Sequence, residues 1–166
     1  MDVTQLMANT ETFKNLLKES ETDIWKGSLF EPLKRLSSRS KGAKAEKMTQ
    51  ETMELLKYIV RKAMSSDHDR VISDYATEIK FSTCWDGELN KFTWQQIRGG
   101  QDYDRIIFIG CNPNDIHMWW ATKDDLKKHV FGRDKLRQHK GKDGEQELYW
   151  LSGVHKMPWF RDMSSF

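Results

Sequence analysis

The chain has 166 residues, of which 37% are hydrophobic and 31% are charged. This length and composition predict one folded domain over residues 1–166 and exclude a disordered chain. Every apolar run falls short of the roughly 18 residues of a membrane helix, and the start of the chain lacks the apolar centre of a secretory signal. Cys84 and Cys111 have neither zinc-site nor disulfide-framework spacing, which favours a reducing compartment. We therefore expect a cytoplasmic protein without a membrane partner.

The formal net charge of +2 is too small to indicate a nucleic-acid binder by itself. Basic residues are nevertheless concentrated within residues 35–47 and 133–142, whereas the acidic residues are spread along the chain. The two segments either offer basic patches for phosphate groups or are two solvated loops.

The sequence up to residue 64 is predicted to be mostly helical. Amphipathic stretches at residues 10–17 and 29–36 predict two small helices, and residues 37–45, rich in Ser, Gly, Lys and Arg, predict an exposed connection. A longer helix is expected over residues 46–64, because apolar residues recur there at three- and four-residue spacing. These residues are Met48, Thr52, Leu55, Leu56, Ile59, Val60 and Ala63.

A β-hairpin is predicted after this helix. Residues 71–72 form a short apolar strand, Ser73 and Asp74 favour a turn, and charged and apolar residues alternate over residues 76–83. The period of two assigns alternate side chains to opposite faces of the second strand. One face carries Ala76, Glu78, Lys80 and Ser82, and the other carries Thr77, Ile79, Phe81 and Thr83.

The rest of the chain predicts further strands and helices in alternation. We expect a helix at residues 92–98, a buried central strand at 105–111 and another strand at 116–121. Thr122 is the predicted N-cap of a helix that reaches about residue 130. Residues 148–151 form a candidate late strand, residues 140–145 a loop, and the piece from residue 155 either packs on the core or forms an interface. This order predicts the α/β class, with a mixed central β-sheet flanked by helices.

Glu78 and Lys80 are the residues best suited to catalysis. They present a carboxylate and an ammonium on one face of a strand whose other face is apolar. Phosphodiester hydrolysis needs a divalent cation to neutralise charge and to lower the pKa of a water, and Mg²⁺ binds carboxylate oxygens. Lys80 would orient or deprotonate that water, or stabilise the developing charge. Most E-x-K tripeptides are merely exposed members of a strand, so the acidic cluster upstream is what strengthens the catalytic interpretation.

A second carboxylate is needed to hold the cation, and three lie upstream of Glu78. If the hairpin pairs as predicted, Asp69 comes close to Glu78 or Lys80. Asp74 lies in the turn, roughly 13 Å from Glu78 along an extended strand. Asp69 is the first choice, and Asp74 and Asp67 stay open because a register slip of a residue or two would change the geometry.

The motifs of residues 42–130 resemble those of the PD-(D/E)xK restriction-endonuclease superfamily. D-H-D-R, E-I-K-F-S and F-T-W-Q-Q-I-R begin at residues 67, 78 and 92, and Y-D follows at residue 103. Their order and spacing are similar to those of one group of type II restriction endonucleases. Asp69, Glu78 and Lys80 fall on the D…ExK motif, and His68 stands where the family name expects proline.

The resemblance implies a restriction-endonuclease-like core and a Mg²⁺-dependent endonuclease that acts on double-stranded DNA. Asp69 and Glu78 would hold the metal, and Lys80 would position water. Glu46, which is otherwise an ordinary acid of a first helical turn, would support the metal site. Gln96, which is otherwise an exposed glutamine on a helix, would face the cleft.

Basic residues near the motif and in the second basic segment are the candidates for DNA contacts. Arg98 either contacts a phosphate or pairs with Asp102 or Asp104. The other candidates are Lys41, Lys44, Arg133, Arg137, Lys140 and Lys142.

A domain of this size covers only part of a duplex site, so cutting both strands predicts a homodimer at a palindrome. Residues 1–40 would form a helical extension, residues 46–130 the catalytic core, and residues 131–166 a DNA-contacting or dimerisation segment. A homing, phage or repair nuclease of the same fold, a catalytically inactive DNA-binding module, and a scaffold that binds a protein through its tryptophans remain alternatives.

Overall fold

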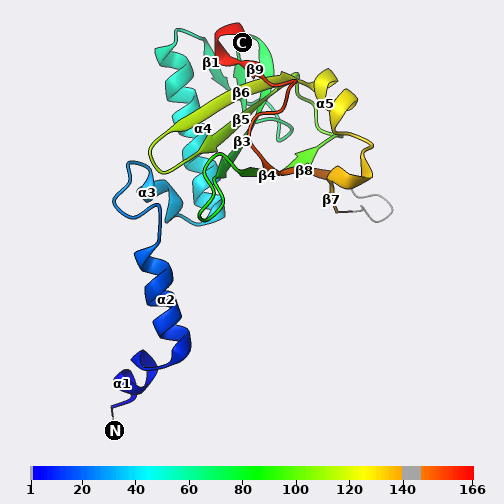
Figure 1. Ribbon diagram of the computed structural model, residues 1–166. Helices are drawn as coiled ribbons and strands as arrows, with labels where there is room; N and C mark the ends of the chain where they lie inside the picture. Colours follow the sequence, from blue (N-terminus) through cyan, green and yellow to red (C-terminus); the bar gives the residue numbers. More distant parts are fainter. Residues whose placement is uncertain (1, 140–146) are drawn as a thin grey trace.

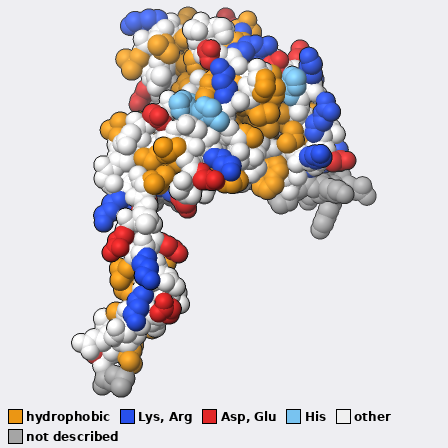
Figure 2. Space-filling view, in the orientation of Figure 1, with side chains coloured by type: hydrophobic (Ala, Val, Ile, Leu, Met, Phe, Trp, Pro, Cys, Tyr) orange, Lys and Arg blue, Asp and Glu red, His pale blue; other side chains and the backbone are white. Residues whose placement is uncertain are grey.

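The computed structural model describes residues 2–139 and 147–166. Two helices, α1 (Val3–Ala8) and α2 (Glu11–Glu21), extend away from the body as an arm (Figure 1), and apolar side chains lie on its surface (Figure 2). The Thr10 hydroxyl caps α2 by accepting a hydrogen bond from the N–H of Phe13 at 3.3 Å. The helix predicted at residues 10–17 is confirmed. Among the described residues, no helix is long and apolar enough to cross a membrane.

Helix α4 (Ser38–Leu55) follows the short helix α3 (Glu31–Lys34) and differs from the prediction at both ends. The exposed connection predicted at residues 37–45 is wrong, because the Ser37 hydroxyl accepts the N–H of Ser40 at 3.2 Å and starts the helix. The predicted end at residue 64 is also wrong. Lys57 takes a left-handed φ of 70°, which stops the helix after Leu55.

The strands form two sheets. The main sheet has the order β1-β2-β3-β5-β6-β9 and the second has the order β4-β8-β7. In the main sheet β3 and β5 are parallel and all other neighbours are antiparallel, which confirms a mixed sheet in an α/β fold with flanking helices. The strands are β1 (Val60–Lys62), β2 (Arg70–Ile72), β3 (Tyr75–Thr83), β4 (Phe92–Arg98), β5 (Arg105–Cys111), β6 (Ile116–Thr122), β7 (Arg137–His139), β8 (Leu148–Val154) and β9 (Arg161–Asp162).

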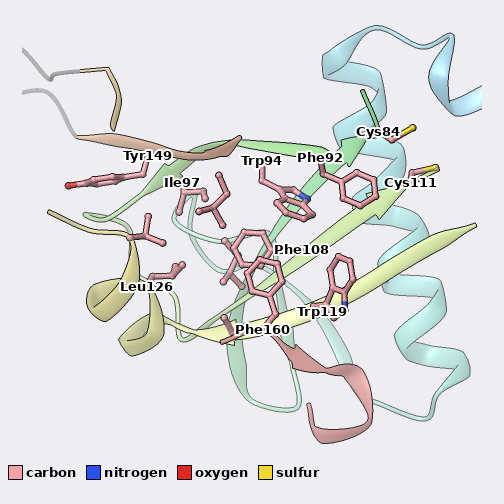
Figure 3. Close-up of a cluster of buried hydrophobic side chains, with 14 of the residues drawn as sticks. Cys84, Phe92, Trp94, Ile97, Phe108, Cys111, Trp119, Leu126, Tyr149 and Phe160 are labelled. Carbon is pink, nitrogen blue, oxygen red and sulfur yellow. The ribbon is translucent and has the colours of Figure 1, made fainter. Parts of the chain in front are cut away.

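Different elements pack against the two faces of the main sheet. On one face Met53 of α4 is buried in a cluster with Ile79 of β3. On the other face β4, β8 and α5 (Lys123–His129) enclose a larger core (Figure 3). In this core Phe108 stacks on Phe160 with ring centroids 4.5 Å apart. Phe160 belongs to the C-terminal piece from residue 155, and this piece therefore packs on the core.

Several predicted elements are confirmed. The hairpin pairs Ile72 with Tyr75 across the predicted turn, and the strands at residues 105–111, 116–121 and 148–151 are present as β5, β6 and β8. Thr122 and Asp125 form the capping box of α5, which confirms the predicted N-cap. The predicted loop at residues 140–145 lies outside the described residues.

The helix predicted at residues 92–98 is wrong, because these residues form β4. Phe92 and Trp94 point inward with the period of a strand, but the register against β8 then shifts, so that Ile97 is the next buried residue. This bulge contains Gln95 and Gln96, the latter with a left-handed φ of 55°. The extra residue breaks the alternation of two and gives an apolar spacing that indicates a helix.

Candidate active site

A cleft lies where β3 extends beyond its hairpin partner. Strand β2 pairs with β3 only as far as Thr77, whereas β5 pairs with β3 as far as Thr83. No described strand pairs with residues 78–83 on the side of β2, and a cleft of about 610 Å³ opens there between α4 and β4. Its lining comprises Ser38, Arg39, Lys41, Gly42, Glu46, Asp69, Glu78, Ile79, Lys80, Phe81, Ser82, Thr83, Thr93, Gln95 and Gln96.

Glu78 and Lys80 lie side by side on the floor of this cleft. Lys80 Nζ is 2.7 Å from Glu78 Oε1, and the side chains of Lys80 and Glu78 are only 18% and 11% exposed, respectively. Burial raises the pKa of Glu78, the Lys80 ammonium lowers it, and the nearby Asp69 carboxylate raises it again. Burial and Asp69 outweigh Lys80, so Glu78 takes up a proton more readily than an exposed glutamate.

Asp69 is the upstream carboxylate that the fold brings to Glu78. Its Oδ2 accepts a hydrogen bond from the N–H of Ile79 at 2.7 Å, which fixes the carboxylate beside the open edge of β3. Asp74 instead lies in the exposed turn, with a side chain 88% exposed, and pairs with Arg61. Asp67 does not line the cleft. The geometry therefore favours Asp69 among the three candidates.

Glu46 also lines the cleft, from the buried side of α4. Burial raises its pKa, and the Asp69 carboxylate raises it further, while Arg70 lowers it. Arg70, which sequence reasoning missed, contacts both α4 and the segment of Asp69. It lies 3.6 Å from Glu46, donates to Gln50 at 3.0 Å and donates to the Asp69 carbonyl at 2.7 Å. Arg70 thus fixes the helix to the aspartate-bearing segment.

The opposite wall is the bulge of β4. Gln96 lines the cleft as the resemblance implies, but from a strand and not from a helix, and Gln95 lies beside it. The bulge explains why two successive residues of one strand line the same cleft, since a regular strand would send them to opposite faces.

The candidate DNA-contacting residues are scattered. Lys41 lines the cleft, together with Ser38 and Arg39, which sequence reasoning missed. Lys44 is exposed on α4 outside the lining, and Arg98 ends β4, also outside it.

In the second basic segment, Arg137 is less available to DNA than the sequence suggests. Arg137 is 2.9 Å from Asp134 and 3.2 Å from Glu147, so its charge is already paired. Arg133 is exposed and donates to the carbonyl of Lys128 at 3.1 Å. Lys140 and Lys142 lie outside the described residues.

The carboxylates fit a hard divalent cation of the Mg²⁺ type. Within the described residues no group of three or more His, Cys, Asp or Glu side chains converges as a closed metal site. An open pair such as Asp69 and Glu78 is nevertheless what Mg²⁺ uses, because this ion keeps several waters and binds one or two protein carboxylates together with substrate phosphates.

Comparisons with known proteins identify no family. No family model and no curated protein matches the chain. Among solved structures it is similar to a bacterial homing endonuclease, I-Ssp6803I, with a TM-score of 0.43 and 14% sequence identity over 72% of this chain and 78% of that chain.

Proposed function

We propose that this chain is a Mg²⁺-dependent endonuclease that hydrolyses phosphodiester bonds in double-stranded DNA, with a catalytic centre of the PD-(D/E)xK type. The observation that carries the proposal is the convergence of Asp69, Glu78 and Lys80 at the open edge of β3, inside a cleft with basic residues at its rim. An exposed E-x-K tripeptide on an ordinary strand would have neither a second carboxylate beside it nor a cleft around it.

The residues of the cleft would have different roles in the hydrolysis. Asp69 and Glu78 would hold Mg²⁺, which when bound neutralises charge on the scissile phosphate and lowers the pKa of a water. Lys80, beside Glu78, would orient the attacking water, accept its proton or stabilise the charge that develops on the phosphate. Glu46 and Gln96 would support the centre from the two walls of the cleft.

Protonation of Glu78 would compete with the cation. The pKa of Glu78 is raised, so the carboxyl keeps its proton to a higher pH than an exposed glutamate does. Glu78 would have to lose that proton before it could hold a cation, so the apparent affinity for Mg²⁺ would rise with pH until the carboxylate is fully ionised. Cleavage should therefore become faster with rising pH over the range in which Glu78 loses its proton.

The duplex would lie along the rim that carries Arg39 and Lys41. Burial lowers the pKa of Lys41, and a phosphate beside it would favour its charged form. Lys44, exposed on the same helix, would extend the contact, and a role of Arg98, Arg133, Lys140 and Lys142 in DNA binding stays a prediction from the sequence.

The biological role that fits this chemistry is that of a type II restriction endonuclease. A homodimer would bring two such clefts to the two strands of a palindrome. Cleavage by this enzyme would leave DNA ends that carry a 5′-phosphate and a 3′-hydroxyl.

Digestion of unmethylated phage DNA by the purified full chain tests the proposal. We expect discrete fragments in Mg²⁺, none in EDTA, and fragment ends that DNA ligase rejoins because they carry 5′-phosphates. Fragments that also form in EDTA would contradict the metal dependence. No cleavage across several DNAs, together with no salt-sensitive DNA binding, would overturn the nuclease proposal.

A further inference from the structure

The β4 bulge has an unusual backbone for its position. Gln96 has a backbone φ of 55°, in the left-handed region that residues other than glycine rarely adopt. Such a residue persists only where its surroundings hold it, and residues of this kind cluster at functional sites. Both bulge residues, Gln95 and Gln96, line the cleft.

One side chain from a distant part of the sequence holds this bulge. Gln138 Oε1 accepts the backbone N–H of Gln96 at 2.8 Å, and Gln138 Nε2 donates to Gln95 Oε1 at 3.4 Å. Gln138 belongs to β7, which is separated from β4 by β8 in the second sheet. Its two amide atoms therefore reach past the central strand to both residues of the bulge.

The position of Gln138 in β7 is itself irregular. Arg137 pairs with Tyr149 and His139 pairs with Leu148, so Gln138 is an extra residue in β7. The β4 bulge lies one step further along β8, between the residues that pair with Leu151 and Tyr149. The two bulges therefore adjoin the same residue of β8, Tyr149, and a single amide group joins them.

We propose that Gln138 is a positioning residue that keeps Gln95 and Gln96 at the cleft by holding the β4 bulge in its left-handed conformation. The proposal rests on the proposed function for its catalytic consequence, and on hydrogen-bond geometry for its structural one. Without the Gln138 acceptor, the Gln96 N–H loses its partner, and Gln96 can relax toward the ordinary strand conformation, which turns its side chain away from the cleft.

Amide hydrogen exchange followed by NMR tests the structural part without any DNA. In Gln138→Ala we expect the Gln96 N–H to exchange at least about tenfold faster, with the amides of β5 unchanged. Gln138→Glu keeps an acceptor for that N–H, and Gln95 can turn its own amide to donate, so the slow exchange should be retained. Gln5→Ala, which removes an exposed glutamine of the arm, is the matched control.

Cleavage kinetics test the catalytic part. In Gln138→Ala we expect kcat to fall about tenfold with KM within about twofold, and Gln138→Glu and Gln5→Ala to keep the rate of the unaltered chain. Unchanged exchange at Gln96 in Gln138→Ala would overturn the proposal. Faster exchange with an unchanged kcat would overturn the positioning role. If the unaltered chain cuts no DNA, the proposed function fails, and the exchange data alone decide whether Gln138 holds the bulge.

Discussion

Replacing Lys80 with methionine is expected to lower the rate of Mg²⁺-dependent DNA cleavage by roughly a hundred- to ten-thousandfold, the range for loss of a group that moves or orients a proton in the transition state. Methionine keeps most of the length and the apolar stem of the side chain but removes the ammonium that lies 2.7 Å from Glu78 Oε1. Single-turnover cleavage, measured with enzyme in excess over DNA, reports the chemical step directly.

Lys62→Met is the control for this substitution. Lys62 is an exposed lysine on the edge strand β1, outside the cleft, so its replacement should leave the rate within about twofold. A Lys80→Met variant that keeps the rate within about twofold, as the control does, would contradict a role of the ammonium in the chemical step.

Replacing Gly110 with alanine is expected to lower the free energy of unfolding by about 1–3 kcal/mol or more, because it overfills the core. A Cβ at this position would lie 2.5 Å from Cε2 of Phe92, and both residues are buried. Urea denaturation gives the value. The same substitution in a Phe92→Leu background should cost less than about 1 kcal/mol, because the smaller side chain frees the space that the new methyl group needs.

Gly42→Ala is the matched control for stability. Gly42 lies inside α4 with nothing within 4 Å of the place that a methyl group would take, and alanine in a helix interior should stabilise the chain by about 0.5–1 kcal/mol. If Gly110→Ala costs as much in the Phe92→Leu background as in the otherwise unaltered chain, the packing of β4 on β5 is contradicted.

The centre of the candidate site was predictable because it is local in sequence. Asp69, Glu78 and Lys80 lie within 12 positions of one another, and a hairpin with strict alternation fixes which of their side chains share a face. The sequence made Asp69 the first choice but left Asp74 and Asp67 open. The hydrogen bond that Asp69 accepts from the N–H of Ile79 favours Asp69 among them.

The two walls of the cleft were harder to predict. The start of α4 depends on a single cap at Ser37, placed in a segment whose Ser, Gly and Lys content indicates a loop. The sequence pattern of β4 predicts a helix, because the bulge at Gln95 and Gln96 interrupts the period of two.

Contacts between distant segments carry no local signal. Arg70 meets Glu46 of α4, and Gln138 meets Gln96, which lies 42 positions earlier in the chain. Periodicity and composition describe one element at a time, so neither can reveal which side chains of separate elements meet. The contacts of Arg70 and Gln138 were therefore found only in the assembled fold, whereas Glu46 and Gln96 were already implied by the family resemblance.

The most direct test of the catalytic centre compares three forms of the full chain on one phage DNA in Mg²⁺: the unaltered protein, Glu78→Gln, and Asp74→Asn, which changes the exposed turn aspartate outside the cleft. We predict discrete fragments from the unaltered protein and from Asp74→Asn, and none from Glu78→Gln at the same concentration, with all three forms showing the same circular dichroism. Cleavage by Glu78→Gln at the rate of the unaltered protein would contradict a catalytic centre at Glu78.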